Sequence, residues 1–182
     1  MWFQNIVSKV LPPRMNGDGS KSQIKELFVP ESEKEHLMKW AENVHAISIS
    51  KVDLQWVQVL CEGWASPLTG FMRESQYLQS LHFNCLFDGQ ISNQSIPIVL
   101  AINQDEKTQV ENLKSITLKY DGNIIAVLQN IEVYPHRKEE RIARQFGTSH
   151  SEHPYIKVCK SPPLLNSSIE FENDVLHVFN FR

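Results

Sequence analysis

Two pairs of residues in this chain have the spacing of incomplete metal sites. His82 and Cys85 stand three positions apart, and so do His150 and His153. Zinc is held by three or four ligands at coordinated spacing, usually including a Cys-x-x-Cys or a helical pair of histidines. Neither pair has further ligands close by in the sequence. We therefore interpret His82 as a histidine at the edge of the core, and the other two histidines as loop residues.

One stretch near the start resembles a nucleotide-binding loop in composition only. A phosphate-binding loop has the pattern Gly-x-x-x-x-Gly-Lys-Ser/Thr and lies between a strand and a helix. In "NGDGSKS" the pair Lys21 and Ser22 follows glycines at the wrong spacing, and no strand is predicted before it. We interpret residues 12–23, which are polar and contain Pro and Gly breakers, as a flexible linker.

A serine in the stretch "EGWASPLTGFM" (62–72) also fails as a nucleophile. A strand-to-helix nucleophile elbow requires Gly-x-Ser-x-Gly, but Ser66 lies three residues after Gly63 and is followed by Pro67. The stretch contains no general base and no pair of metal ligands. It is more typical of a rigid structural corner than of a reactive site.

A charged run, "HRKEERIAR" (136–144), offers both basic and acidic groups. Its charged residues are Arg137, Lys138, Glu139, Glu140, Arg141 and Arg144. Such a run could contact an anionic ligand or RNA, but it is more typical of a solvated helix face with internal ion pairs. Adjacent residues on a helix point about 100° apart, so the two glutamates cannot flank one substrate atom. We assign no catalytic, cofactor-binding or metal-binding residue.

The composition is that of an ordinary globular protein of 182 residues, with 41% apolar residues, 21% charged residues and a net charge of -3. This slightly negative net charge gives no overall electrostatic attraction for nucleic acid or anionic lipid, so neither is expected as a partner. No apolar run reaches the roughly 18 to 20 residues that span a bilayer. The three cysteines, Cys61, Cys85 and Cys159, are typical of reduced thiols in a cytosolic protein, and we expect a cytoplasmic location, with the nucleus as the alternative.

The first residues carry an apolar stripe of their own. The apolar positions recur every four residues and end at two prolines, as in a short amphipathic helix; they are Trp2, Phe3, Ile6, Val7, Val10 and Leu11. A secretory signal would begin with basic residues and end at a small-residue cleavage site, and neither is present. Because only Lys9 is basic before the prolines, we favour a docking helix or a leftover linker over a membrane-surface anchor.

The rest of the chain alternates irregularly between helical and extended patterns. Helices are predicted over 30–44, 51–63, 73–83, 105–113 and 136–146, and strands over 45–51 and 95–102. The strongest local signal is in 115–134, where two β-rich runs flank Asp121-Gly122, the pair favoured in a type I′ hairpin turn. Residues 147–158 are expected to form a loop and then a strand, and 171–182 alternate without a clear register. This mixture predicts an α+β fold around a small curved sheet or barrel.

Several of these stretches, taken in order, resemble a known family. "DLQWVQVLCEGWASPLTGFMRESQYLQSLHF", "SIPIVLAI", "YDGNIIAVLQNIEVYPHRKEERIARQFGT" and "HPYIKV" are similar to the amino-terminal domain of ATP sulfurylase (sulfate adenylyltransferase). The similarity is greatest to the form fused in animal bifunctional PAPS synthases, and it runs from about Lys25 to Val158. It implies a PUA-like pseudo-barrel with peripheral helices, which packs beside a catalytic domain.

The resemblance also implies roles for the corner and for the basic run. Gly63, Pro67 and Gly70 would shape the corner, and Trp64 and Phe71 would anchor it in the core. In a complete enzyme, the basic residues Arg137, Lys138 and Arg141 could line a groove between domains near the nucleotide.

The family joins sulfate to the α-phosphorus of ATP, with magnesium, to give adenosine 5′-phosphosulfate and pyrophosphate. Its catalytic stretch, like Gln-x-Arg-Asn-Pro-x-His-x-Gly-His, does not occur in this sequence, nor does the phosphate-binding loop of the kinase half. We therefore expect an N-terminal helix and linker (1–24), a PUA-like domain (25–158) and a divergent tail (159–182) in a truncated, non-catalytic form. The alternatives are a regulatory or assembly partner of full-length sulfurylase or PAPS synthase subunits and, less favoured, an RNA-binding module.

Overall fold

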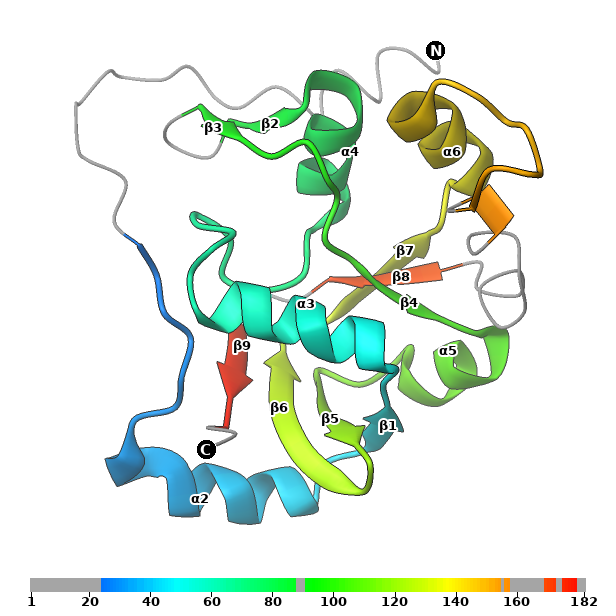
Figure 1. Ribbon diagram of the computed structural model, residues 1–182. Coiled ribbons are helices and arrows are strands. Elements are labelled where there is room, and N and C mark those ends of the chain that lie inside the picture. Colours follow the sequence, from blue (N-terminus) through cyan, green and yellow to red (C-terminus); the bar gives the residue numbers. More distant parts are fainter. Residues whose placement is uncertain (1–23, 88–90, 155, 158–168, 173–174, 180–182) are drawn as a thin grey trace.

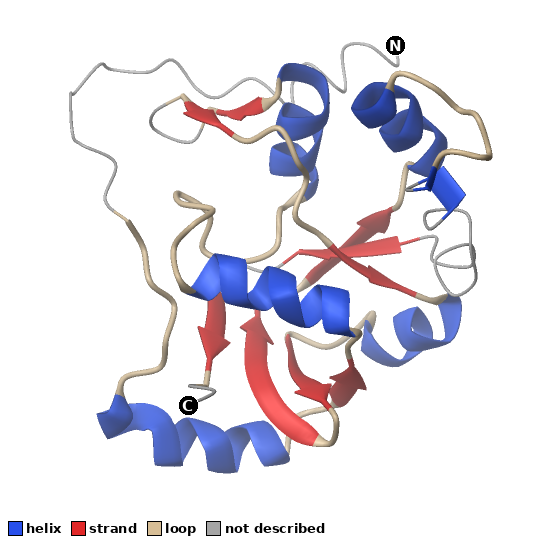
Figure 2. Cartoon of the chain, in the orientation of Figure 1, coloured by secondary structure: helices blue, strands red, loops and turns tan. Residues whose placement is uncertain are grey.

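The sheets of this protein are built from segments that are far apart in the sequence (Figure 1). The computed structural model describes residues 24–87, 91–154, 156–157, 169–172 and 175–179. The predicted N-terminal stripe, most of the linker and Cys159 lie outside these residues. In the view of Figure 2, helices α2, α5 and α6 lie at the periphery, and the strands of the two larger sheets lie toward the centre.

Five helices are described, and each falls where the sequence pattern predicts one. They are α2 (Glu31–Glu42), α3 (Lys51–Cys61), α4 (Glu74–Phe83), α5 (Gln104–Val110) and α6 (Lys138–Phe146). Two of them begin at a reciprocal capping box, in which the first helical N–H groups gain side-chain acceptors. Ser50 and Asp53 form this box at α3, and Asn103 and Glu106 form it at α5. These local hydrogen bonds explain why both helix starts could be located from the sequence.

The strands form two larger sheets and one short hairpin. The four-stranded sheet has the order β1 (Ala46–Ser48), β5 (Ser115–Tyr120), β6 (Asn123–Gln129) and β9 (Val175–Val178). The three-stranded sheet has the order β4 (Leu100–Ile102), β8 (Ile169–Glu172) and β7 (Glu132–Pro135). The short hairpin pairs β2 (Cys85–Leu86) with β3 (Ser92–Asn93). The predicted α+β class is confirmed, and the sheets of the described residues do not close into a barrel.

The predicted hairpin between β5 and β6 is confirmed. Asp121 and Gly122 both have positive φ, 50° and 79°, as the two central residues of a type I′ turn require. The two strands then pair antiparallel from Tyr120 and Asn123 back to Ser115 and Gln129, with a register shift between Leu118 and Lys119. The local turn chemistry therefore sets the register of the pairing up to that shift.

Strands β8 and β9 come from the segment that we expected to be a separate tail. Strand β8 lies between β4 and β7 and pairs with both in antiparallel register. Strand β9 pairs with β6 on one side. On its other side Val29 N–H donates to the Val178 carbonyl at 2.9 Å, and Val178 N–H donates to the Leu27 carbonyl at 3.1 Å. Strand β9 therefore joins the four-stranded sheet to residues 27–29, and β8 completes the three-stranded sheet.

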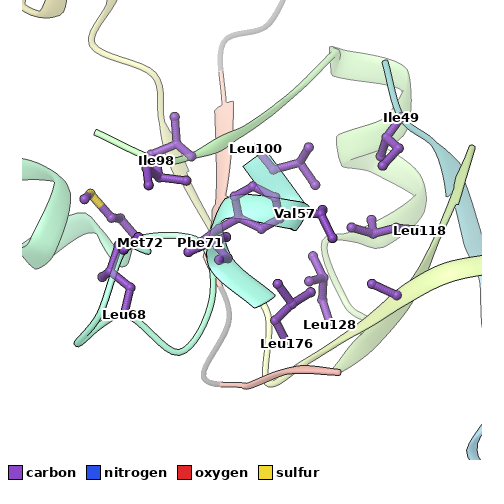
Figure 3. Close-up of a cluster of buried hydrophobic side chains, with 14 of the residues drawn as sticks. Ile49, Val57, Leu68, Phe71, Met72, Ile98, Leu100, Leu118, Leu128 and Leu176 are labelled. Carbon is purple, nitrogen blue, oxygen red and sulfur yellow. The ribbon is translucent and has the colours of Figure 1, made fainter. Parts of the chain in front are cut away.

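The main core lies where α3 and the corner meet the two larger sheets. Figure 3 shows the Phe71 ring among the side chains of Val57 from α3 and Leu100 from β4. Leu128 and Leu176 lie near them in the same view, and all five side chains are buried. A second, smaller cluster lies under α2, where Ala41 and Val29 pack with Val127 of β6 and with Phe179, which follows β9.

Two extended segments differ from their sequence predictions. Only the last three residues of 95–102 form a strand, because Pro97 has no N–H to give to a ladder and the Ile98 carbonyl accepts from Met72 N–H at 2.9 Å. The strand predicted at the end of 147–158 is wrong. Residues 154 and 156–157 are helical, and Lys157 N–H donates to the His153 carbonyl at 2.9 Å, which is the spacing of a helical turn.

Candidate functional site

The charged groups of α6 meet those of α4 in one partly buried cluster. An Arg137 guanidinium nitrogen lies 2.9 Å from Glu74 Oε1 on α4, and its other nitrogen lies 3.8 Å from Glu140 Oε2. His82 Nε2 lies 2.9 Å from Glu140 Oε1, a close contact that is an ion pair when the imidazole is protonated. The four side chains are only 13% to 25% exposed. The cluster therefore joins the two helices, with each carboxylate beside a basic group.

This cluster changes one interpretation made from the sequence and agrees with another. Arg137 and Glu140 do form the expected ion pair within α6, but they are half-buried against α4 rather than on a solvated face. The interpretation of His82 as a residue at the edge of the core holds, with Glu140 as its neighbour. Sequence reasoning missed Glu74, because a glutamate in the first turn of a helix is ordinary and nothing local links it to a residue 63 positions away.

A histidine two positions before α6, His136, has a strongly altered basicity. Burial, with smaller effects from the positive charges of Arg141 and Lys138, lowers the pKa of His136 from 6.5 to about 3. Its imidazole is therefore neutral at physiological pH. A neutral imidazole beside two cations can accept a proton only in strong acid, so His136 is poorly suited to be a general base near pH 7.

The remaining basic side chains of α6 make structural contacts or line a groove. Arg141 donates to Gln145 Oε1 at 3.3 Å and to the Pro97 carbonyl at 3.5 Å. Arg144 lies at a groove of about 330 Å³ between α4 and α6, whose apolar lining includes Leu81 and Ile96. One cation on an apolar groove does not make a triphosphate site, which uses several charged or backbone donors.

The two pairs with metal-like spacing are not completed by the fold. No group of three His, Cys, Asp or Glu side chains in the described part of the chain could hold a metal ion. His153 packs on the Phe146 ring with centroids 5.2 Å apart, and His150 Nδ1 accepts from the Glu152 N–H at 3.3 Å.

Neither the Cys61 thiol nor the Ser66 hydroxyl is placed as an activated nucleophile. Burial, followed by the nearby Glu62 carboxylate, raises the pKa of Cys61 to about 11, so its thiolate is scarce at neutral pH. Ser66 Oγ donates to the Gly63 carbonyl at 2.7 Å and accepts from Lys25 N–H at 3.0 Å. Both residues hold the corner together instead of presenting a nucleophile.

The corner itself confirms one predicted anchor and contradicts the other. Phe71 is 1% exposed, as expected, but Trp64 is 80% exposed and does not enter the core. Gly63, with φ of 76°, reverses the chain after α3. The inward positions that follow are then taken by Ala65 and Leu68, which are buried. The indole is left on the outer side of the turn.

Two further grooves offer no catalytic set. One, of about 390 Å³, lies between α5 and β7 and is lined by Lys107, Val110, Glu111, Ile131, Glu132, Val133, Tyr134 and Pro135. The other, of about 490 Å³, lies over charged side chains of α2.

No helix in the described part of the chain is long and apolar enough to span a bilayer.

Comparison with known proteins places this arrangement in a family. The family described as PUA-like domain matches residues 16–165. ATP sulfurylase 4, chloroplastic, from Arabidopsis thaliana is 51% identical over 144 residues, which cover 77% of this chain and 30% of that protein. ATP sulfurylase 2 from the same plant is 43% identical over 159 residues, covering 86% and 33%. A sulfate adenylyltransferase of Staphylothermus marinus is 28% identical over 151 residues, covering 80% and 38%.

A solved structure supports the fold alone. The chain described as the hexameric APS kinase from Thiobacillus denitrificans superposes with a TM-score of 0.55 at 23% identity, covering 63% of this chain and 23% of that one. This protein spans about a third of the length of the sulfurylase relatives that it matches. It belongs to the PUA-like domain family and is homologous to the N-terminal region of ATP sulfurylases.

Proposed function

We propose that this protein serves sulfate activation as a non-catalytic PUA-like domain of the sulfate adenylyltransferase type. We further propose that it is a shortened form related to the sulfurylase half of animal bifunctional PAPS synthases, located in the cytoplasm. The observation that supports the non-catalytic role is the α4–α6 cluster. Its Arg137 guanidinium lies against two carboxylates of the same domain, where it stabilises the packing of two helices.

The chemistry of the reaction explains why this observation matters. Transfer at the α-phosphorus of ATP depends on positioning the triphosphate and stabilising the charge that develops on it. A site for it needs several uncompensated donors or a metal facing one cavity. Two observations support the proposal: the Arg137 charge is offset by Glu74 and Glu140, and the described residues hold no group of three His, Cys, Asp or Glu side chains that could bind a metal ion. ATP and magnesium are therefore proposed to belong to a catalytic domain elsewhere.

The test is an activity measurement on the purified full chain. Pyrophosphate release is measured with ATP and magnesium, with and without sulfate, beside a full-length ATP sulfurylase as the positive control. We expect no sulfate-dependent release from this chain. Sulfate-dependent release that co-purifies with the chain, and that follows its concentration, would overturn the proposal.

The shortened form requires its own test. A peptide that crosses from Val158 into Cys159, found by mass spectrometry in cell extracts, would show that this sequence is made as a protein. A cellular product in which the sulfurylase sequence continues past Val158, and no crossing peptide, would contradict the shortened form without touching the activity result.

A second candidate function is assembly with full-length sulfurylase or PAPS synthase subunits. The exposed Trp64 on a rigid corner favours it, since exposed aromatic side chains on ordered backbone are typical anchors in protein interfaces. The chain is mixed with a full-length enzyme and the enzyme is captured by an affinity tag. Co-elution that is lost on Trp64→Ser is the expected result, and an absence of co-elution with the unchanged chain argues against this function.

A further inference from the structure

The two most exposed large apolar side chains that the structure describes lie at one place. Trp64 is 80% exposed and Ile24 is 72% exposed. Ile24 lies over Gly63, the residue before Trp64, since its Cγ2 is only 2.6 Å from the position that a Cβ at Gly63 would occupy. We call Ile24 and Trp64 together the Trp64 surface.

The backbone under the Trp64 surface is held at several points. Gly63 N–H donates to the Leu60 carbonyl, and Trp64 N–H to the Val59 carbonyl, both at 3.1 Å. On the Ile24 side, Lys25 N–H donates to Ser66 Oγ at 3.0 Å. A preordered apolar surface loses little conformational entropy when something packs on it, so even a weak contact can be occupied.

We propose that residues 2–11 of the same chain cover the Trp64 surface with their apolar stripe. These residues lie outside the described part of the chain. The described chain begins at Ile24, on the surface itself. The connecting residues 12–23 span roughly 20 Å as a flexible chain. The stripe is therefore tethered within reach of the surface, at an effective concentration of ~1 mM.

The stripe needs an apolar surface on which to pack, and the Trp64 surface exposes apolar side chains to water. An isolated helix shorter than about 12 to 15 residues is marginal in water, so a stripe of this length needs an apolar surface on which to fold. The Trp64 surface offers an indole and an aliphatic side chain that water otherwise contacts. Beside it in the sequence lie the exposed carboxylates Glu26 and Glu62 and the exposed basic Lys25, so the local charges largely offset one another. Apolar contact is therefore what favours this occupant.

Hydroxyl-radical footprinting of the intact 182-residue chain, read by mass spectrometry, tests the proposal at Trp64. The stripe is disrupted by the double substitution Ile6→Asp and Val10→Asp. The matched control is Asn5→Asp and Ser8→Asp, which adds the same charge to the polar side of the same segment. A contact with a Kd of ~0.5 mM at ~1 mM effective concentration is occupied about two thirds of the time. We therefore expect Trp64 oxidation to rise about threefold in the stripe variant and to stay unchanged in the control.

Two residues in the same samples show whether the fold is intact. Phe71, which is buried, should stay protected in every variant, and Phe83, which is 52% exposed on α4, should be oxidised equally in all of them. Equal oxidation of Trp64 in the unchanged chain and the stripe variant would overturn the proposal, and so would an equal rise in the control variant. Protection of Trp64 that deepens with protein concentration would assign the surface to a second copy and would also overturn it.

Discussion

The corner at 62–72 and the α4–α6 cluster hold the same molecule together by different means. The corner depends on apolar burial and on a backbone turn, with Phe71 and Leu68 inside and Gly63 at positive φ. The cluster depends on charges, through Arg137 between two carboxylates. Apolar burial responds weakly to salt and pH, whereas charge pairs respond to both. The difference indicates which conditions should loosen α6 while leaving the corner intact.

The largest expected effect is at the apolar centre of the corner. Phe71→Ala removes a ring that is 1% exposed and leaves a cavity, so we expect a loss of about 3–5 kcal/mol in the free energy of unfolding. Trp64→Ala is the matched control, because its ring is 80% exposed and should change stability little. Urea unfolding followed by circular dichroism measures both. Similar losses for the two variants would mean that Trp64 is buried in solution.

The next effect separates close contact from backbone strain. Gly63→Ala and Gly122→Ala both place a side chain at positive φ, 76° and 79°. A Cβ at Gly63 would also lie 2.9 Å from the Lys25 carbonyl oxygen, whereas nothing lies within 4 Å of one at Gly122. We expect about 1–2 kcal/mol of destabilisation at Gly122 from strain alone, and roughly 3 kcal/mol at Gly63. Equal losses in urea unfolding would show that segment 24–25 does not lie on the corner.

A pH dependence should distinguish the α6 side from the corner. Because the native pKa of His136 is lowered to about 3, the unfolded chain takes up a proton near pH 6.5 that the native chain does not. Stability from this residue is therefore complete above pH 6.5 and falls as the pH drops toward 3. Between pH 7 and pH 5 this histidine should lower the free energy of unfolding by at most about 2 kcal/mol. The variant His136→Gln should not show that decrease. Unfolding of both proteins at the two pH values measures it, and parallel losses would place His136 in water.

The smallest effect concerns the salt sensitivity of the cluster. Glu74→Gln weakens the ion pair with Arg137, in which the Glu74 side chain is 13% exposed and the Arg137 side chain 25% exposed. We expect the free energy of unfolding to fall by about 1 kcal/mol, and by less in high salt. Glu35→Gln is the control, since its pair with Lys39 is 84% and 72% exposed and should contribute less. Thermal melts at low and high ionic strength compare them. A salt-independent loss at Glu74 would point to packing rather than charge.

Much of the fold followed from local patterns. The helical periodicity placed α3 and α5, whose starts carry capping boxes at Ser50 and Asn103, and Asp121-Gly122 placed the hairpin, because each signal acts through neighbours only a few residues away. The interpretation of His82 also held, but its neighbour on α6 could not be read from the sequence. Glu74 and Arg137 are 63 residues apart, and no local pattern reports such a pair.

By itself, the sequence determined the five helices, the turn of the β5–β6 hairpin and the family resemblance, since propensities and motif spacing act within a few residues of the chain. Only the tertiary structure decided that Trp64 lies outside while Phe71 lies inside, and that strands β8 and β9 complete the two larger sheets. Both facts depend on which distant segment fills the space beside a given side chain or strand edge. That competition for burial is settled by the packing of the whole chain.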